Sequence, residues 1–168
     1  MPTFAALKPG DLAPDFTAQA SLGGTVFTFS LAEALKKGPV VLYFQPAAFT
    51  TGCTIKAHDF ADATDTYRAL GATVIAVWHD NIDPLNKFSV SECRSKFAVA
   101  ADGDRSIMKS YDAVLAIKPE YADRFVRHCA RWTHYLCLPV AQPREACREL
   151  SRRVAEMGFH AAEALALR

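Results

Sequence analysis

The sequence predicts one α/β domain over residues 1–168, with a central β-sheet flanked by helices. Two apolar segments of strand length, residues 39–46 (PVVLYFQP) and 72–78 (ATVIAVW), are typical of strands that a parallel sheet buries on both faces. Helical segments alternate with these strands, as the crossover connections of a parallel sheet require. A chain of 168 residues is long enough for one hydrophobic core, and it contains no internal repeat and no low-complexity linker.

The other elements are predicted from local signals, in chain order. Two short strands joined by Gly23-Gly24 form an N-terminal hairpin, and the second arm contains the β-favouring segment Val26-Phe27-Thr28-Phe29. Ser30 is suited to cap a short helix that Gly38 ends. We further expect a helix over 51–70 closed by Gly71, a helix over 84–96 opened by Pro84, a strand over 97–102 and a helix over 104–111.

Composition and charge exclude several classes of partner. The net charge of +1 gives no electrostatic reason to expect binding to nucleic acid or to an anionic membrane. No apolar segment approaches the roughly 18–20 residues that a membrane span needs, and the N-terminus does not resemble a signal peptide. We therefore expect a cytoplasmic protein. The five cysteines are an odd number and do not suggest a secreted disulfide framework.

The segment QPAAFTTGCTIKAHDF contains the candidate catalytic residues. Cys53 falls in the first turn of the helix that follows the first buried strand. The N–H groups and the positive dipole end of a helix start favour a thiolate, the nucleophilic form of cysteine. Thr50 can place its hydroxyl near the sulfur, and Pro46 can shield the thiolate from water. The alternative is that Cys53 is an inert core residue, because unpaired cysteines are often buried.

Four segments resemble peroxiredoxins, in particular the subgroup related to bacterioferritin comigratory protein. The pattern Pro46-x-x-x-Thr50-x-x-Cys53 resembles the active-site loop of that family. The segments PGDLAPDFT, ATVIAV and DRSIMKSYDA resemble the same subgroup, in the same order, so the similarity covers about residues 8–124. The resemblance implies a thioredoxin-like fold with an N-terminal β-hairpin and a central mixed β-sheet flanked by helices.

The resemblance also implies a thiol peroxidase that reduces hydrogen peroxide and organic hydroperoxides without metal, flavin or haem. Cys53 would attack the peroxide and become a sulfenic acid, while Thr50 and nearby backbone N–H groups hold the peroxide oxygens. An arginine of the family pairs with the thiolate, and Arg124 is our candidate for it, with Arg131 as the competitor. The expected partners are a hydroperoxide and thioredoxin or a similar dithiol reductant. We expect a monomer or a homodimer.

The chain departs from the subgroup around its second cysteine. Some members have a resolving cysteine five residues after the first, where this chain has His58. The other placement in the subgroup is the following helix, and there Cys93 is the candidate resolving residue, against a one-cysteine enzyme in which it is an ordinary helix residue. A thiol-disulfide oxidoreductase is the alternative function on the same fold. It would require a Cys-x-x-Cys motif ending at Cys53, but position 50 is Thr. Zinc-ligand spacing is absent from the sequence.

Residues 125–168 differ in composition from the rest of the chain. They contain seven Arg and four Glu but no Lys or Asp, and the resemblance stops at Arg124. Codons for residues 125–133 can be chosen so that the next reading frame encodes Ser-Tyr-Val-Ile-Ala-Pro-Asp-Gly, which restores the Pro-Asp-Gly turn expected after Arg124. We therefore hypothesise a frameshift that leaves the last hairpin without its turn and a sheet edge uncovered. Residues 143–166 still favour a helix.

Sequencing the coding DNA and measuring the intact mass of the natural protein test this hypothesis together. We expect the DNA to carry an inserted or deleted base near codon 125, or the natural mass to differ from that of the 168-residue sequence. An in-frame gene with the matching mass would exclude a sequencing error. Close relatives with the same tail would exclude a frameshift altogether.

Overall fold

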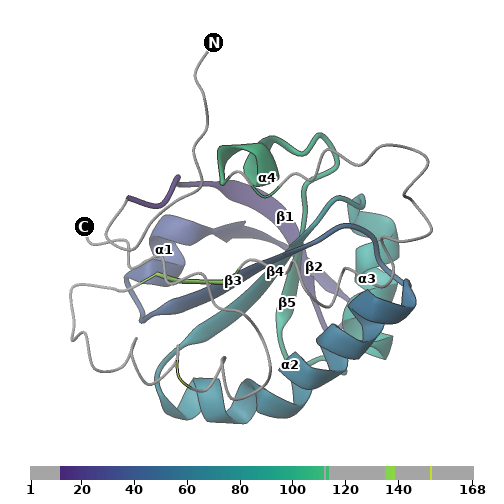
Figure 1. The fold of residues 1–168 in the computed structure, drawn as a ribbon, viewed down its shortest axis with the longest axis horizontal. Coiled ribbons are helices and arrows are strands. Elements are labelled where there is room, and N and C mark those ends of the chain that lie inside the picture. The colour runs from purple at the N-terminus through teal and green to yellow at the C-terminus, as the bar shows by residue number, and fades with distance from the viewer. Residues whose placement is uncertain (1–11, 112, 114–134, 139–151, 153–168) are drawn as a thin grey trace.

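The computed structural model describes residues 12–111, 113, 135–138 and 152. A mixed six-stranded sheet in the order β2-β1-β5-β4-β3-β6 lies between two layers of helices (Figure 1). The strands are β1 Thr17–Leu22, β2 Thr25–Ser30, β3 Val40–Gln45, β4 Thr73–Trp78, β5 Ala98–Ala101 and β6 Tyr135–Leu138. The helices are α1 Leu31–Leu35, α2 Thr51–Ala69, α3 Ile82–Ser91 and α4 Ser106–Ser110.

Strands β3, β4 and β5 form the parallel centre of the sheet. Strand β4 pairs with β3 on one side and with β5 on the other, as the apolar segments predict. The N-terminal hairpin joins this centre through β1, which is antiparallel to β5. The pairing of β3 with β4 runs to the last residue of each strand, where Gln45 is the register partner of Trp78. The loops after these two strands therefore start side by side.

The hairpin turn explains the Gly23-Gly24 pair. Leu22 pairs with Thr25, so the turn has two residues, and both adopt positive φ (57° and 84°). Such a turn matches the twist of a hairpin and favours glycine at both positions. The predicted hairpin is confirmed.

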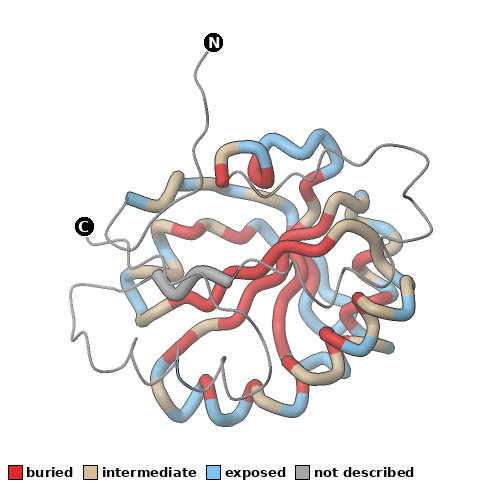
Figure 2. Tube along the Cα trace, in the orientation of Figure 1, coloured by how far each residue is buried: buried red, intermediate tan, exposed pale blue. Residues whose placement is uncertain are grey.

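The two helical layers bury the two faces of the sheet (Figure 2). Helices α2 and α3 cover a cluster that includes Tyr43, Cys53, Phe60, Trp78 and Cys93. Helices α1 and α4 cover the second cluster on the opposite face. No helix within the described ranges combines the length and the apolar character needed to cross a bilayer.

Helix α3 differs from the expected range 84–96 at both ends. It begins at Ile82, and Pro84 lies in its first turn, where the missing N–H costs nothing. It ends at Ser91 because Arg94 and Ser95 adopt positive φ, 49° and 56°. The Ser95 N–H donates to the Ser89 carbonyl at 2.9 Å, which closes the helix end. Cys93 therefore lies in a turn after the helix, and the prediction that it is a helix residue is wrong.

Helix α4 is shorter than the expected range 104–111, because a buried carboxylate begins it. Asp102, the residue after β5, is 3% exposed and accepts hydrogen bonds from the N–H groups of Ile107 and Met108 at 3.1 and 2.8 Å. These bonds satisfy donors of the first helical turn. The helix consequently starts at Ser106.

The edge of β3 is covered, contrary to the expectation from the altered tail. Strand β6 pairs antiparallel with Val40–Tyr43 of β3. Four residues suffice for this pairing, and backbone hydrogen bonds do not require the family turn. In the segment expected to be helical, 143–166, the one described residue is Arg152, which is helical. The rest of that segment lies outside the described residues.

Tyr111 connects the N-terminal segment to the second cluster. Its hydroxyl donates a hydrogen bond to the Pro14 carbonyl, 97 residues away in sequence. Its ring contacts Phe44 and Phe16, with centroid distances of 5.2 and 6.3 Å. Burial raises the pKa of the Tyr111 hydroxyl, and the nearby Asp15 carboxylate raises it further.

We predict that Tyr111→Phe lowers the free energy of unfolding by about 1 kcal/mol at neutral pH, because the ring contacts remain and one hydrogen bond is lost. The folded pKa lies above the unfolded value near 10. The contribution of Tyr111 is therefore complete below pH 10 and is lost as the pH rises above it. Urea unfolding at pH 8 and above pH 10 should show the difference between the two proteins shrinking. A constant difference would contradict this role.

Candidate active site

Cys53 is placed as predicted, at the start of a long helix. It is the third residue of α2, its side chain is completely buried, and it is not in a disulfide. The first turn of α2 contains no acidic residue that would oppose a negative sulfur. A helix start directs N–H groups and the positive dipole end outward, so the position favours an anionic group.

The loop of residues 46–50 enters this helix in a constrained conformation. Pro46 is half-buried at the end of β3, and Thr50 is the N-cap in extended conformation. The Thr50 hydroxyl does not cap the helix; it donates to the Ala47 carbonyl at 3.2 Å. On the other side of the same peptide group, the Ala48 N–H donates to the Asp80 carboxylate at 2.8 Å. One peptide plane therefore connects Asp80 to Thr50.

The backbone of Phe49 has a conformation that its residue type disfavours. Its φ of 60° is left-handed, and for a bulky residue this costs about 1–3 kcal/mol. Its ring, 52% exposed, packs edge-to-face on Phe88 at 5.1 Å, which contributes about 0.5–1.5 kcal/mol beyond the buried area. The aromatic contact is of the same order as the strain and offsets part of it. The hydrogen bond from the Ala48 N–H to the Asp80 carboxylate, worth about 1.5–3 kcal/mol, holds the Ala47–Ala48 peptide group of the same loop.

Two buried donors lie at the paired ends of β3 and β4. Gln45 and Trp78, the register partners at the ends of β3 and β4, are 2% and 0% exposed. The Gln45 Nε2 and Trp78 Nε1 atoms have no hydrogen-bond partner within the part of the chain that is described. Trp78 also packs on Phe88 at 4.6 Å, so it supports the residue on which Phe49 rests.

Cys93 lies in the same buried cluster as Cys53, on the turn after α3. It is completely buried and is not in a disulfide. Burial raises the pKa of the Cys93 thiol, and the adjacent Glu92 carboxylate raises it further. In this position Cys93 is a protonated thiol and a poor nucleophile. The two cysteines thus have different environments within one cluster.

Polar side-chain contacts tie the turn of residues 92–96 to α2. The Glu92 carboxylate lies within hydrogen-bond distance of His58 Nε2, at 2.9 Å, and Lys96 forms an ion pair with Asp65 at 3.1 Å. Arg94 pairs with Asp62. The two exposed ion pairs contribute about 0–1 kcal/mol each, and the left-handed Arg94 and Ser95 cost free energy. Backbone hydrogen bonds from Cys93 to Phe88 and from Ser95 to Ser89 hold the turn, together with the burial of Cys93.

Arg124 and Arg131 lie outside the described residues, so the site is described without its candidate arginine. The sequence analysis missed Asp80 and Phe49. Asp80 follows the parallel neighbour of β3, and the carboxyl ends of parallel neighbours share one edge, so its position was the available signal. The left-handed conformation of Phe49 has no sequence signal.

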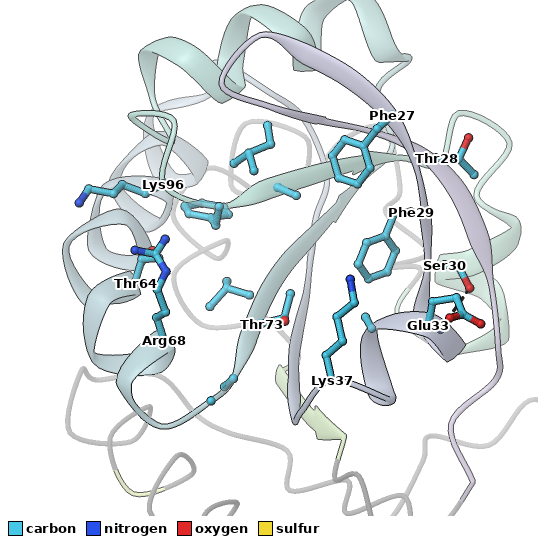
Figure 3. A pocket seen from close by; sticks show the side chains of 17 residues that line it. Phe27, Thr28, Phe29, Ser30, Glu33, Lys37, Thr64, Arg68, Thr73 and Lys96 are labelled. Atoms are coloured by element: carbon cyan, nitrogen blue, oxygen red, sulfur yellow. Dashed lines mark hydrogen bonds between the residues drawn. The ribbon is translucent and has the colours of Figure 1, made fainter.

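A separate cavity of about 630 Å³ lies at the opposite end of the sheet (Figure 3). Its lining includes Thr73 at the start of β4, Phe97 before β5 and Phe29 of β2. Arg68 and Lys96 lie at its rim, and both pair with Asp65. The cavity shares no residue with the Cys53 loop. Among the described residues, no group of three or more His, Cys, Asp and Glu side chains is placed to hold a metal ion.

Comparison with known proteins identifies relatives of the described core. The AhpC/TSA family model matches residues 9–126, close to the predicted end of the resemblance. A Bcp-type peroxiredoxin of Helicobacter pylori strain J99 is 36% identical over 107 residues, 64% of this chain and 67% of the relative. Peroxiredoxin Bcp of Escherichia coli K12 is 30% identical over 105 residues, 62% and 64% of the two chains. The matches thus span about two thirds of the length of these relatives.

Solved structures give the same result for the fold. The crystal structure of the peroxidoxin BcpB from Mycobacterium tuberculosis aligns with a TM-score of 0.59 and 27% identity, over 66% of this chain and 70% of that one. Mycobacterium tuberculosis AhpC aligns with a TM-score of 0.60 over 67% and 71% of the two chains, and at 19% identity it bears on the fold alone. The predicted thioredoxin-like fold is confirmed. The family match over most of the chain shows that this protein belongs to the AhpC/TSA family, among the peroxiredoxins of the Bcp and PrxQ type.

Proposed function

We propose that this chain is a thiol peroxidase in which Cys53 reduces hydrogen peroxide and organic hydroperoxides. The observation that carries the proposal is the position of Cys53, buried in the first turn of α2 directly after a constrained loop. A helix start promotes the thiolate, and the loop provides polar groups on one side of it. The family relationship supports the same activity.

The first step joins sulfur to oxygen. The Cys53 thiolate attacks the terminal peroxide oxygen, the O–O bond breaks, and the leaving oxygen takes a proton to become water or an alcohol. Cys53 is oxidised to a sulfenic acid. The Thr50 hydroxyl donates its hydrogen bond to the Ala47 carbonyl, so its oxygen can accept a hydrogen bond from the O–H of the incoming peroxide. In the proposal Pro46 shields the thiolate, and Arg124 pairs with it.

The second step uses Cys93 as the resolving thiol. Opening of the turn at 92–96 exposes Cys93, which ionises more readily in water and attacks the Cys53 sulfenic acid. A disulfide forms and water leaves. Thioredoxin or a similar dithiol then reduces the disulfide. We propose further that the protein is a monomer or a homodimer and that it acts in the cytoplasm.

The alternative is a family member with reduced activity. The family match ends at residue 126, where the composition of the chain changes. Arg124 lies two residues before that end. A low rate of peroxide reduction with normal formation of α2 would favour this alternative.

We predict that Cys53→Ser abolishes peroxide reduction, because serine cannot form the attacking thiolate, while Cys93→Ser retains single-turnover reduction. Both cysteines are completely buried in one cluster, so the two variants are a matched pair for stability. Peroxide consumption in single turnover, with circular dichroism as the folding control, checks this. Consumption by Cys53→Ser at the wild-type rate would reject the assignment.

We further predict that one equivalent of peroxide converts the wild-type chain to a Cys53–Cys93 disulfide. The condensation of a sulfenic acid with a thiol in the same buried cluster is the physical reason. Peptide mapping under non-reducing conditions should find the cross-link in the wild type and a trapped sulfenic acid in Cys93→Ser. A stable sulfenic acid in the wild type, with Cys93 still open to alkylation after unfolding, would indicate one-cysteine chemistry.

A further inference from the structure

We infer that Asp80 is a positioning residue that orients the Thr50 hydroxyl through the Ala47–Ala48 peptide group. The inference rests on the proposed function, because orientation of Thr50 matters where a peroxide binds beside Cys53. It adds to that function a residue from the segment that follows β4.

Two hydrogen bonds on one peptide plane carry the argument. The Asp80 Oδ2 atom accepts from the Ala48 N–H at 2.8 Å, and the Thr50 Oγ1–H donates to the Ala47 C=O at 3.2 Å. The N–H and the C=O belong to the same planar group and point in opposite directions. Fixing the N–H toward Asp80 therefore fixes the C=O toward Thr50, and the carboxylate also polarises the carbonyl that receives the hydroxyl hydrogen.

The orientation of the hydroxyl decides its chemistry. A threonine hydroxyl has one hydrogen and accepts with its remaining lone pairs. With its hydrogen directed to the Ala47 carbonyl, the Thr50 oxygen has only acceptor capacity left for a peroxide. If the peptide plane turned, the hydrogen would be released, and the hydroxyl could donate to the thiolate in place of accepting from the peroxide. Such a bond would stabilise the thiolate before reaction and leave the peroxide O–H without an acceptor.

Asp80 holds a peptide group in a loop that also contains a strained residue. Phe49 is left-handed, but its φ belongs to the next peptide along the chain, so the conformation of Phe49 does not fix the Ala47–Ala48 plane, whereas the Asp80 bond does. The Phe88 ring contact acts on the Phe49 side chain and not on this plane. Asp80 is half-buried after β4, and the pairing of Gln45 with Trp78 sets its distance from the loop. Cys53 is anchored separately in the core by α2, so loss of Asp80 leaves the sulfur in position.

The test compares four variants of the full chain: Asp80→Ala, Asp80→Asn, Thr50→Val and the double variant Asp80→Ala/Thr50→Val. Asp83→Asn is the matched control, since Asp83 is an exposed carboxylate in the first turn of α3. Two rates are measured for Cys53: oxidation by hydrogen peroxide and alkylation by iodoacetamide. The alkylation rate measures the reactivity of the Cys53 thiolate. It does not depend on Thr50 as an acceptor, because iodoacetamide has no peroxide O–H that needs one.

We expect Asp80→Ala to lower the peroxide rate constant by about tenfold or more, while alkylation stays within about threefold of the wild type. Asp80→Asn keeps an oxygen acceptor and should remain within about threefold in both rates. Thr50→Val should be slow, and adding Asp80→Ala should slow it by less than threefold further, because no hydroxyl remains to be oriented. Asp83→Asn should match the wild type.

Three kinetic results would each overturn the inference: equal losses in peroxide and alkylation rates for Asp80→Ala, additive losses in the double variant, or Asp80→Asn as slow as Asp80→Ala. Amide hydrogen exchange at Ala48 separates this inference from the proposed function. Its protection should fall in Asp80→Ala and persist in Asp83→Asn, whether or not the chain reduces peroxide. Unchanged protection in Asp80→Ala would overturn the inference, whereas a wild type inactive toward peroxide would reject the proposed function.

Discussion

The parallel pairing of β3 with β4 is the constraint on which the rest of the site depends. The two strands are in register to their last residues, Gln45 and Trp78, so their carboxyl ends stop at the same level of the sheet. The loop that leads to Cys53 leaves one end, and the segment carrying Asp80 leaves the other. A hydrogen bond between residues 32 apart in sequence thereby becomes a short-range contact. Local sequence alone would leave the loop in a different conformation, because Phe49 disfavours positive φ.

The same cluster gives two cysteines opposite properties. Cys53 is held by a 19-residue helix whose start favours negative charge. Cys93 lies in a turn that contains two left-handed residues, and burial raises the pKa of its thiol. The two cysteines thus lie on different kinds of element, one on a long helix and the other on a turn. Local stability differs across a fold in this way.

The sequence predicted the elements whose signals are local. The buried strands are evident from apolar composition, the hairpin from Gly23-Gly24, and the position of Cys53 from the strand-to-helix transition. The end of α3 could not be predicted, because neither Arg94 nor Ser95 is a residue type that indicates positive φ. The role of Asp80 in fixing the loop depends on a long-range pairing register, and no local pattern encodes it.

The register of β3 and β4 also bears on how such a chain can change in evolution. Insertions in the outward-facing hairpin turn would leave the central strands unchanged. A single-residue insertion inside Thr73–Trp78 would exchange the faces of every side chain after it. Trp78 would leave the cluster that contains Cys53, and Asp80 would shift along the strand axis by about 3.3 Å, beyond the reach of Ala48. Strand β4, Thr73–Trp78, is therefore expected to tolerate substitution far better than a change in length.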